Sequence, residues 1–116
     1  TAKNAGVKNF DKFHNAGYKG LYNGETADDI ARRKGLRYRE DILDNMGSVE
    51  FIANLFRISQ TEQKLKRDNT QTEKEACVTH NKIGKIVRKA IEEAGRNYAR
   101  GFAYTRKEFK AIRKRE

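Results

Sequence analysis

The sequence predicts an all-α domain in which short N-terminal helices pack on a long antiparallel helical hairpin, followed by a basic C-terminal helix. The 116 residues include no proline, which suits continuous helices with short connections. Apolar residues recur at steps of three and four in two long stretches that are separated by only a few residues. Hydrophobic residues make up 36% of the chain, so we expect a modest core and an elongated body.

The first short helix and the loop after it lie near the N-terminus. Its apolar positions have helical spacing and are Val7, Phe10 and Phe13. Gly17 is expected to end this helix, since glycine is the usual residue just beyond a helix C-terminus. Residues 18–24 then form a glycine-rich loop. We expect its Tyr18 and Tyr22 to pack on the core, with stacking on nucleic-acid bases as the alternative.

Two further short helices precede residue 47. Residues 26–29, Thr-Ala-Asp-Asp, form a start of the capping-box type, and Gly35 ends the helix. Residues 40–46 predict the next helix. Three of its apolar side chains are expected to point inward: Ile42, Leu43 and Met46.

The first long helix is predicted from Ser48, its N-cap, to Asp68. One stripe is apolar and is expected to face the core: Phe51, Leu55, Ile58 and Leu65, flanked by Ile52 and Phe56. The opposite stripe is polar: Glu50, Asn54, Arg57, Thr61 and Lys64. Asn54 and Arg57 are predicted to have a structural or partner-binding role, because they lie between apolar neighbours. A buried arginine would need a partner, and Asp41 or Asp44 is a candidate.

The second long helix is predicted to begin after a capping box of Thr72 and Glu75 and to end at Gly95. Gly84 lies inside it and is unfavourable there, so we expect a close approach to another helix at this point. His80 lies on the apolar stripe of the same helix. A hydrogen-bonded core histidine is the favoured interpretation over a metal ligand.

The chain is expected to divide into a helical domain, residues 1–95, and a basic C-terminal segment, residues 96–116. That segment has eight Lys or Arg against two Glu, a net +6 of the total +10. Residues 105–108 begin with a threonine and end with a glutamate, which predicts a short helix from about residue 106.

The net charge of +10 and the pI near 9.9 indicate contact with a phosphate backbone, although a solvated basic surface is the alternative. The candidate nucleic-acid-binding residues are Arg32, Arg33, Lys34, Lys64, Lys66, Arg67, Lys85, Arg88 and Lys89. Lys82 belongs to the cluster of the last three. Affinity would then depend on helix-borne charge and not on the reading of bases.

The sequence gives no sign of an enzyme. It has no phosphate-binding glycine loop of the P-loop type and no serine or cysteine nucleophile motif. Cys77 and His80 are three residues apart, but the further ligands of a zinc site are not evident. We therefore expect no catalytic residue, no metal and no cofactor. A single cysteine and the lack of a membrane-spanning run indicate a cytoplasmic protein, and DNA binding would make it nucleoid-associated.

Five linked motifs carry a resemblance to a known family. They are Gly17-Tyr18-Lys19-Gly20-Leu21-Tyr22, Arg33-Lys34-Gly35-Leu36, Ile42-Leu43-Asp44-Asn45-Met46-Gly47-Ser48, Ala53-Asn54-Leu55-Phe56-Arg57, and Gln60-Thr61-Glu62-Gln63-Lys64-Leu65-Lys66-Arg67-Asp68. In this order they resemble the C-terminal half of the bacterial DNA-damage-inducible protein D family. The likeness continues through His80, Gly84 and Arg88 and covers roughly residues 5 to 95.

The resemblance implies a role in the SOS response, in which the domain modulates recombination without catalysis, through DNA or through the RecA filament on single-stranded DNA. It also implies an N-terminal Bro-like domain elsewhere in the full-length chain. Typical members continue into a segment with glycine and proline, whereas residues 96–116 are basic and proline-free here. The alternative function is a protein-interaction or dimerisation module, with a homodimer as one possible form.

Overall fold

The computed structural model describes residues 2–38 and 41–97, and this part of the chain is all helical. The elements are η1 (Lys3–Ala5), α1 (Phe10–Leu21), α2 (Ala27–Arg33), η3 (Leu43–Asn45), α3 (Ser48–Arg67) and α4 (Glu73–Asn97). The all-α prediction is therefore confirmed. The helix expected from about residue 106, and the basic segment as a whole, fall almost entirely outside the described residues.

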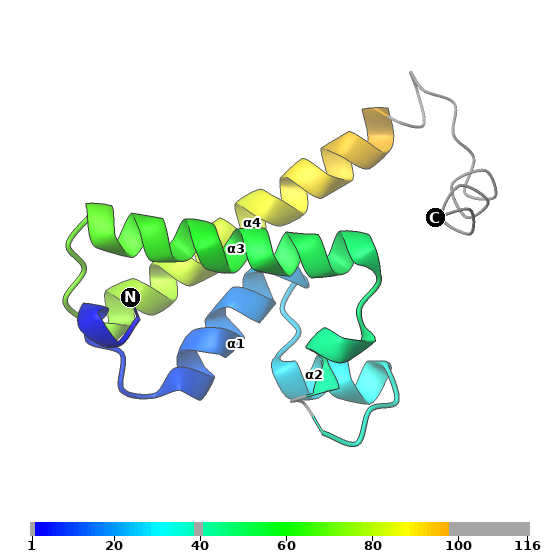
Figure 1. The fold of residues 1–116 in the computed structure, drawn as a ribbon, viewed down its shortest axis with the longest axis horizontal. Helices are drawn as coiled ribbons and strands as arrows, with labels where there is room; N and C mark the ends of the chain where they lie inside the picture. The colour runs from blue at the N-terminus through cyan, green and yellow to red at the C-terminus, as the bar shows by residue number, and fades with distance from the viewer. Residues whose placement is uncertain (1, 39–40, 98–116) are drawn as a thin grey trace.

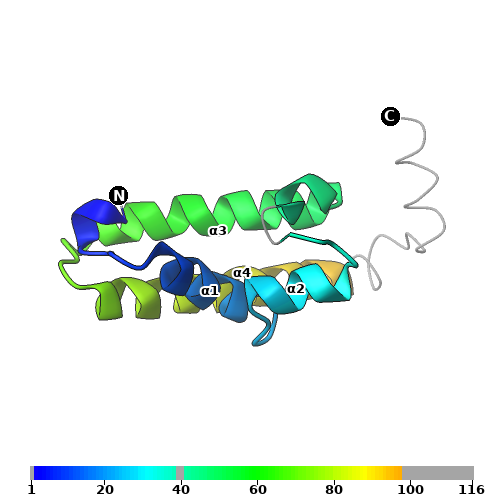
Figure 2. The ribbon, with the colours of Figure 1, turned by 90° about the horizontal axis from the view of Figure 1, so that it is seen from below.

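The helices form two layers. Figure 2 shows α3 as one layer and α1, α2 and α4 as the other. In Figure 1, α4 starts beside the C-terminal end of α3, crosses behind it and diverges from its N-terminal half. Helix α4 packs mainly on α1 and less on α3. The two long helices thus cross, and the main partner of the second one is the short helix α1.

Three glycines let α1 and α4 approach each other closely. A Cβ atom added to Gly84 of α4 would lie 2.7 Å from the Gly17 carbonyl oxygen and 2.8 Å from the Leu21 nitrogen. Gly20 of α1 faces the Gly84 Cα atom from the other side. The predicted close approach at Gly84 is present, and the helix that it meets is α1. Gly17 was expected to end α1, but the helix continues to Leu21. A Cβ atom at Gly17 would meet the His80 and Arg57 side chains, so this glycine makes room for them.

The orientation of α3 is the opposite of the predicted one. The polar stripe faces the other layer, where Asn54, Arg57 and Thr61 are at most 1% exposed. The stripe expected in the core faces outward, and Ile52 and Phe56 are 63% and 54% exposed. Leu65, at the C-terminal end of the helix, is buried as expected. His80 of α4 and Tyr22, just after α1, hydrogen-bond to Arg57 and Asn54 at this layer boundary and hold the polar stripe inward.

The predicted helix caps agree with the structure better than the predicted apolar stripe of α3 does. The capping box at Thr26 is formed with Asp29, and Gly35 follows α2 with a left-handed φ of 71°. The Thr72 hydroxyl accepts from the Glu75 amide at the start of α4, as predicted.

Four further predictions about boundaries or faces differ from the structure. Gly47 and not Ser48 is the N-cap of α3. Helix α4 (Glu73–Asn97) continues past Gly95, which was expected to end it. The described part of the third short helix is only the 3₁₀ turn η3, in which Leu43 is exposed and not inward.

Candidate nucleic-acid interface

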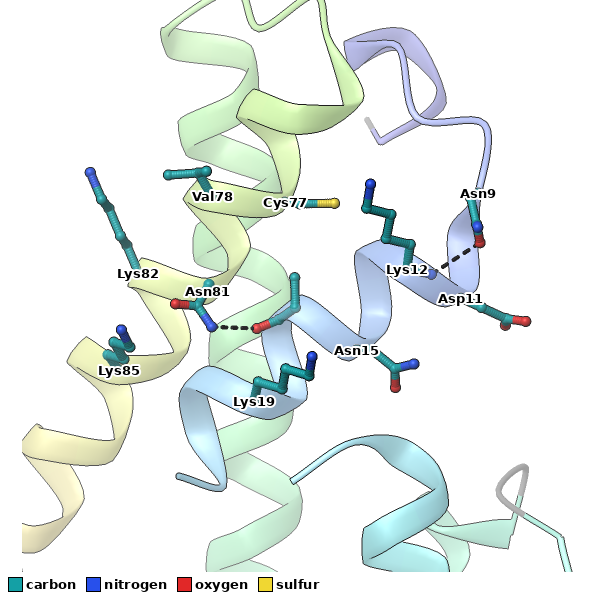
Figure 3. Close-up of a pocket in the computed structure, with 11 residues that line it drawn as sticks. Asn9, Asp11, Lys12, Asn15, Lys19, Cys77, Val78, Asn81, Lys82 and Lys85 are labelled. Atoms are coloured by element: carbon teal, nitrogen blue, oxygen red, sulfur yellow. Dashed lines mark hydrogen bonds between the residues drawn. The ribbon is translucent and has the colours of Figure 1, made fainter. Parts of the chain in front are cut away.

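A shallow groove of about 730 Å³ runs between α1 and α4 on the face that points away from α3 (Figure 3). Helix α1 contributes Asp11, Lys12, Asn15, Ala16 and Lys19, and α4 contributes Cys77, Val78, Asn81, Lys82 and Lys85, with Asn9 at the edge. In Figure 3, α3 passes behind the two helices. The groove is therefore on the outer surface of the α1–α4 layer.

Four lysines give this groove its charge. Lys12 and Lys19 are seven residues apart on α1, which places them on one helix face. Lys82 and Lys85 are three apart on α4 and also share a face. All four are exposed, and none forms an ion pair with another described residue. Asp11 is the one acidic residue among those that line the groove.

The groove has a fixed width because its walls are joined below the lysines. The glycine contact brings the two backbones together, and the Asn81 side-chain amide donates to the Ala16 carbonyl at 3.0 Å. The Asn15 side-chain carbonyl accepts from the Ala27 amide at 2.9 Å, which ties α1 to the start of α2. Two closely spaced helices that are joined in this way hold the four lysines at set positions relative to one another.

The predicted cluster on α2 is largely neutralised. Arg33 binds both carboxylate oxygens of Glu25, at 2.9 and 3.2 Å, and this pair raises the pKa of the guanidinium. Lys34 is half-buried and contacts Glu50 at 2.7 Å. Arg32 lies 3.6 Å from Asp29. These cations have partners inside the domain and are poor candidates for phosphate contacts.

Two of the other six predicted cations also have partners inside the domain. Lys64 pairs with Asp68 at 2.9 Å, and Arg88 binds Glu92 at 2.8 Å and the Leu21 carbonyl at 3.1 Å. Four of the nine predicted cations are exposed and form no ion pair within the described chain: Lys66, Arg67, Lys85 and Lys89. Of these, Lys85 alone lines the groove.

The three predicted clusters do not form one surface. Figure 1 places α2 near the N-terminal end of α3, whereas the cluster at Lys64–Arg67 lies at the other end of that helix. Sequence reasoning missed Lys12 and Lys19, which complete the groove. Lys19 was missed because residues 18–24 were predicted to be a loop, so its spacing of seven from Lys12 became a shared helix face only with α1 continuing to Leu21.

A buried chain of polar groups supports this arrangement from the α3 side. The Arg57 guanidinium donates to the Asn54 side-chain carbonyl at 3.0 Å and to the Nε2 atom of His80. His80 in turn donates from Nδ1 to the Phe13 carbonyl at 2.9 Å, so the network assigns the Nδ1–H tautomer. The Tyr18 ring lies 4.9 Å from the guanidinium carbon, in cation–π geometry. One arginine thereby links α3 to both helices of the groove.

The chain continues from Asn54 toward α2. The Asn54 amide donates to the Tyr22 hydroxyl at 3.0 Å and to the Glu50 carbonyl at 2.9 Å. The Tyr22 hydroxyl donates to the Glu50 carboxylate, which also binds Lys34. Asp41 and Asp44 were the candidate partners of Arg57, and this was wrong: its partners are uncharged. Asn54 and Arg57 are enclosed, so the structure shows an internal role, and their contact with another molecule stays a prediction.

Burial sets the protonation of this core. Desolvation, followed by the charge of Arg57, lowers the pKa of His80 to about 3. The ring is therefore neutral, and its Nε2 atom accepts a hydrogen bond from the Arg57 guanidinium. Burial, followed by the hydrogen bond to Glu50, raises the pKa of the Tyr22 phenol well above its ordinary value, so the phenol stays protonated and donates to Glu50. His80 is thus a hydrogen-bonded core histidine, as the sequence indicated.

Within residues 2–38 and 41–97, no group of three or more His, Cys, Asp or Glu side chains is placed to hold a metal ion. No helix among them is both long and apolar enough to cross a membrane.

The described chain is therefore an all-helical domain with a lysine-lined groove on one face and a buried polar core behind it. It belongs to the DinD C-terminal domain family, whose family model matches residues 1–112. It is 48% identical over 97 residues to DNA damage-inducible protein D of Escherichia coli strain K12, a match that covers 81% of this chain and 35% of that protein. The chain thus spans about a third of the relative's length. No solved structure matches.

Proposed function

We propose that this domain acts without catalysis in the DNA-damage response and binds the DNA backbone through the α1–α4 groove. The role in DNA damage is suggested by the name of the relative, DNA damage-inducible protein D. The observation that supports DNA binding is the groove itself, with four lysines that form no ion pair in the described chain. A single strand, free or in a RecA filament, is the proposed ligand, and modulation of recombination is the proposed outcome.

Phosphate contact and base reading make different demands on a site. The groove offers lysine ammonium groups and the amides of Asn15 and Asn81, and both amides are already bonded to backbone groups. No aromatic side chain lines it. We therefore propose a sequence-independent contact through phosphates, because the ammonium groups suit phosphate oxygens and the groove has no aromatic side chain on which a base could stack.

The test is charge reversal in the groove with a matched control. Lys82→Glu with Lys85→Glu should abolish most of the binding to a single-stranded oligonucleotide at low salt. Because each phosphate contact contributes about 0.7 to the salt slope, loss of two should make the slope shallower by about 1.4. Lys66→Glu with Arg67→Glu changes the net charge equally at the end of α3 and should have the smaller effect.

The two double variants separate a specific groove from general charge. Equal loss of affinity in both would show that the net charge of +10 acts without a defined site. If the parent chain shows no binding at low salt, the DNA proposal is wrong for this domain. The alternative function, a protein-interaction module, would then remain, and RecA-filament binding without DNA contact would be its first test.

A further inference from the structure

The outward side of α3 is an apolar surface with no assigned role. Its five side chains are Val49, Phe51, Ile52, Leu55 and Phe56, which we call the α3 face. Their exposed fractions run from 39% to 63%. Aromatic and branched aliphatic side chains have about 150–250 Å² when fully exposed, so the α3 face leaves roughly 450 Å² of apolar surface accessible. A patch of this size matches the largest apolar patch of a typical monomer, which is often a functional surface.

A groove extends this surface onto α4. It has a volume of about 330 Å³ and lies where the two long helices diverge. Val49, Ile52 and Phe56 form one wall and Ala90, Ile91 and Ala94 the other. The small alanines on α4 leave the groove open beside the larger side chains of α3. The surface therefore combines a ridge and a hollow, which is the shape that a packed helix requires.

We propose that the α3 face is the interface of a homodimer, in which it packs on the same face of a second copy of this chain. An interface of standard size covers about 800 Å² on each partner, and about 65% of a homodimer interface is apolar. The α3 face supplies nearly all of that apolar area before the groove wall on α4 is counted. A two-fold arrangement would set the ridge of each copy against the hollow of the other.

Charge decides in favour of a second copy. Between Val49 and Gln60 the charged residues of α3 are Glu50 and Arg57, and both are engaged in the buried polar chain. The first three turns of the helix thus present no free charge outward. Two chains of net charge +10 can meet on this face without opposing like charges, and their lysine grooves then point away from each other. An acidic protein partner would find no cation on the α3 face to attract it.

The experiment measures the mass of the full chain in solution without DNA. Sedimentation equilibrium from about 1 to 100 µM in 0.3 M salt should show a dimer of the 13.4 kDa chain. Phe56→Glu and, separately, Ile52→Glu should weaken dimerisation by on the order of a hundredfold, as central interface side chains do. The control is Val78→Glu, which changes a valine that is 46% exposed in the lysine groove between α1 and α4, away from the α3 face. It should leave the dimer intact.

Folding is checked by circular dichroism, since both substituted side chains are more than half exposed in the single chain. Should either variant lose helix, Ser59→Cys in a Cys77→Ser background gives a second measurement, because Ser59 is exposed on α3 one turn beyond Phe56. Dimerisation through the α3 face predicts efficient oxidative cross-linking at this position. A parent chain that stays monomeric at 100 µM would overturn the proposal. So would a dimer that persists in both glutamate variants.

Discussion

The glycine contact between α1 and α4 can be tested with one added methyl group. A Cβ atom at Gly84 would lie 2.7 Å from the Gly17 oxygen and 2.8 Å from the Leu21 nitrogen. Both are backbone atoms, so no side-chain rotation relieves the clash and α1 must move. Overpacking of this kind costs up to about 3 kcal/mol, whereas alanine improves helix propensity by about 1 kcal/mol. Gly84→Ala should therefore destabilise the domain by about 2 kcal/mol.

The control is Gly95→Ala on the same helix, where an added Cβ atom meets nothing within 4 Å. Gly95→Ala gains the same helix propensity without a clash, so it should be neutral or should stabilise the domain by up to about 1 kcal/mol. Thermal and urea denaturation followed by circular dichroism measure both. A loss of 2 kcal/mol corresponds to a fall in Tm of roughly 8–16 °C for a domain of this size. If Gly84→Ala melts with or above the parent, the close contact does not exist.

Two further predictions concern the buried polar chain. The pKa of His80 is about 3 in the folded state against an ordinary 6.5. The stabilisation that depends on a neutral His80 is therefore fully present above pH 6.5 and is lost as the pH falls below it. Urea denaturation should show about 1.4 kcal/mol less stability at pH 5.5 than at pH 7.5, and His80→Gln should flatten this dependence. Arg57→Met should cost about 3 kcal/mol, because it leaves the Asn54 carbonyl and His80 without their donor, whereas the exposed, paired Arg33→Met should cost less than about 1 kcal/mol.

Short-range rules explain what the sequence could predict. The start of α2 follows from Thr26 and Asp29, three residues apart, and its end from Gly35. The extent of α3 and the start of α4 depend on turns and caps within a few residues. Gly84 predicted a close contact with another helix, because glycine inside a long helix is otherwise unfavourable. None of these conclusions required knowledge of which helices meet.

The orientation of α3 could not be derived in this way. An apolar stripe of Phe51 and Leu55 opposite a polar stripe of Asn54 and Arg57 ordinarily places the apolar one inside. Here the hydrogen-bond partner of Arg57 across the layer boundary is His80, 23 residues away on another helix. Such partners become visible only in the folded chain. The lysine groove could not be predicted for the same reason, because it forms only where α1 contacts α4 in the folded chain.

The two proposals together predict how binding depends on the length of the DNA. A homodimer through the α3 face would carry two lysine grooves, one directed outward on each side, and a long strand could engage both. The second contact would then be intramolecular and could raise the affinity by tenfold or more, on the order of the gains seen for linked sites. Phe56→Glu should lose this gain on a long strand and bind a short oligonucleotide as the parent does. Equal loss on both lengths would show that Phe56 affects the groove itself, although they lie on opposite layers.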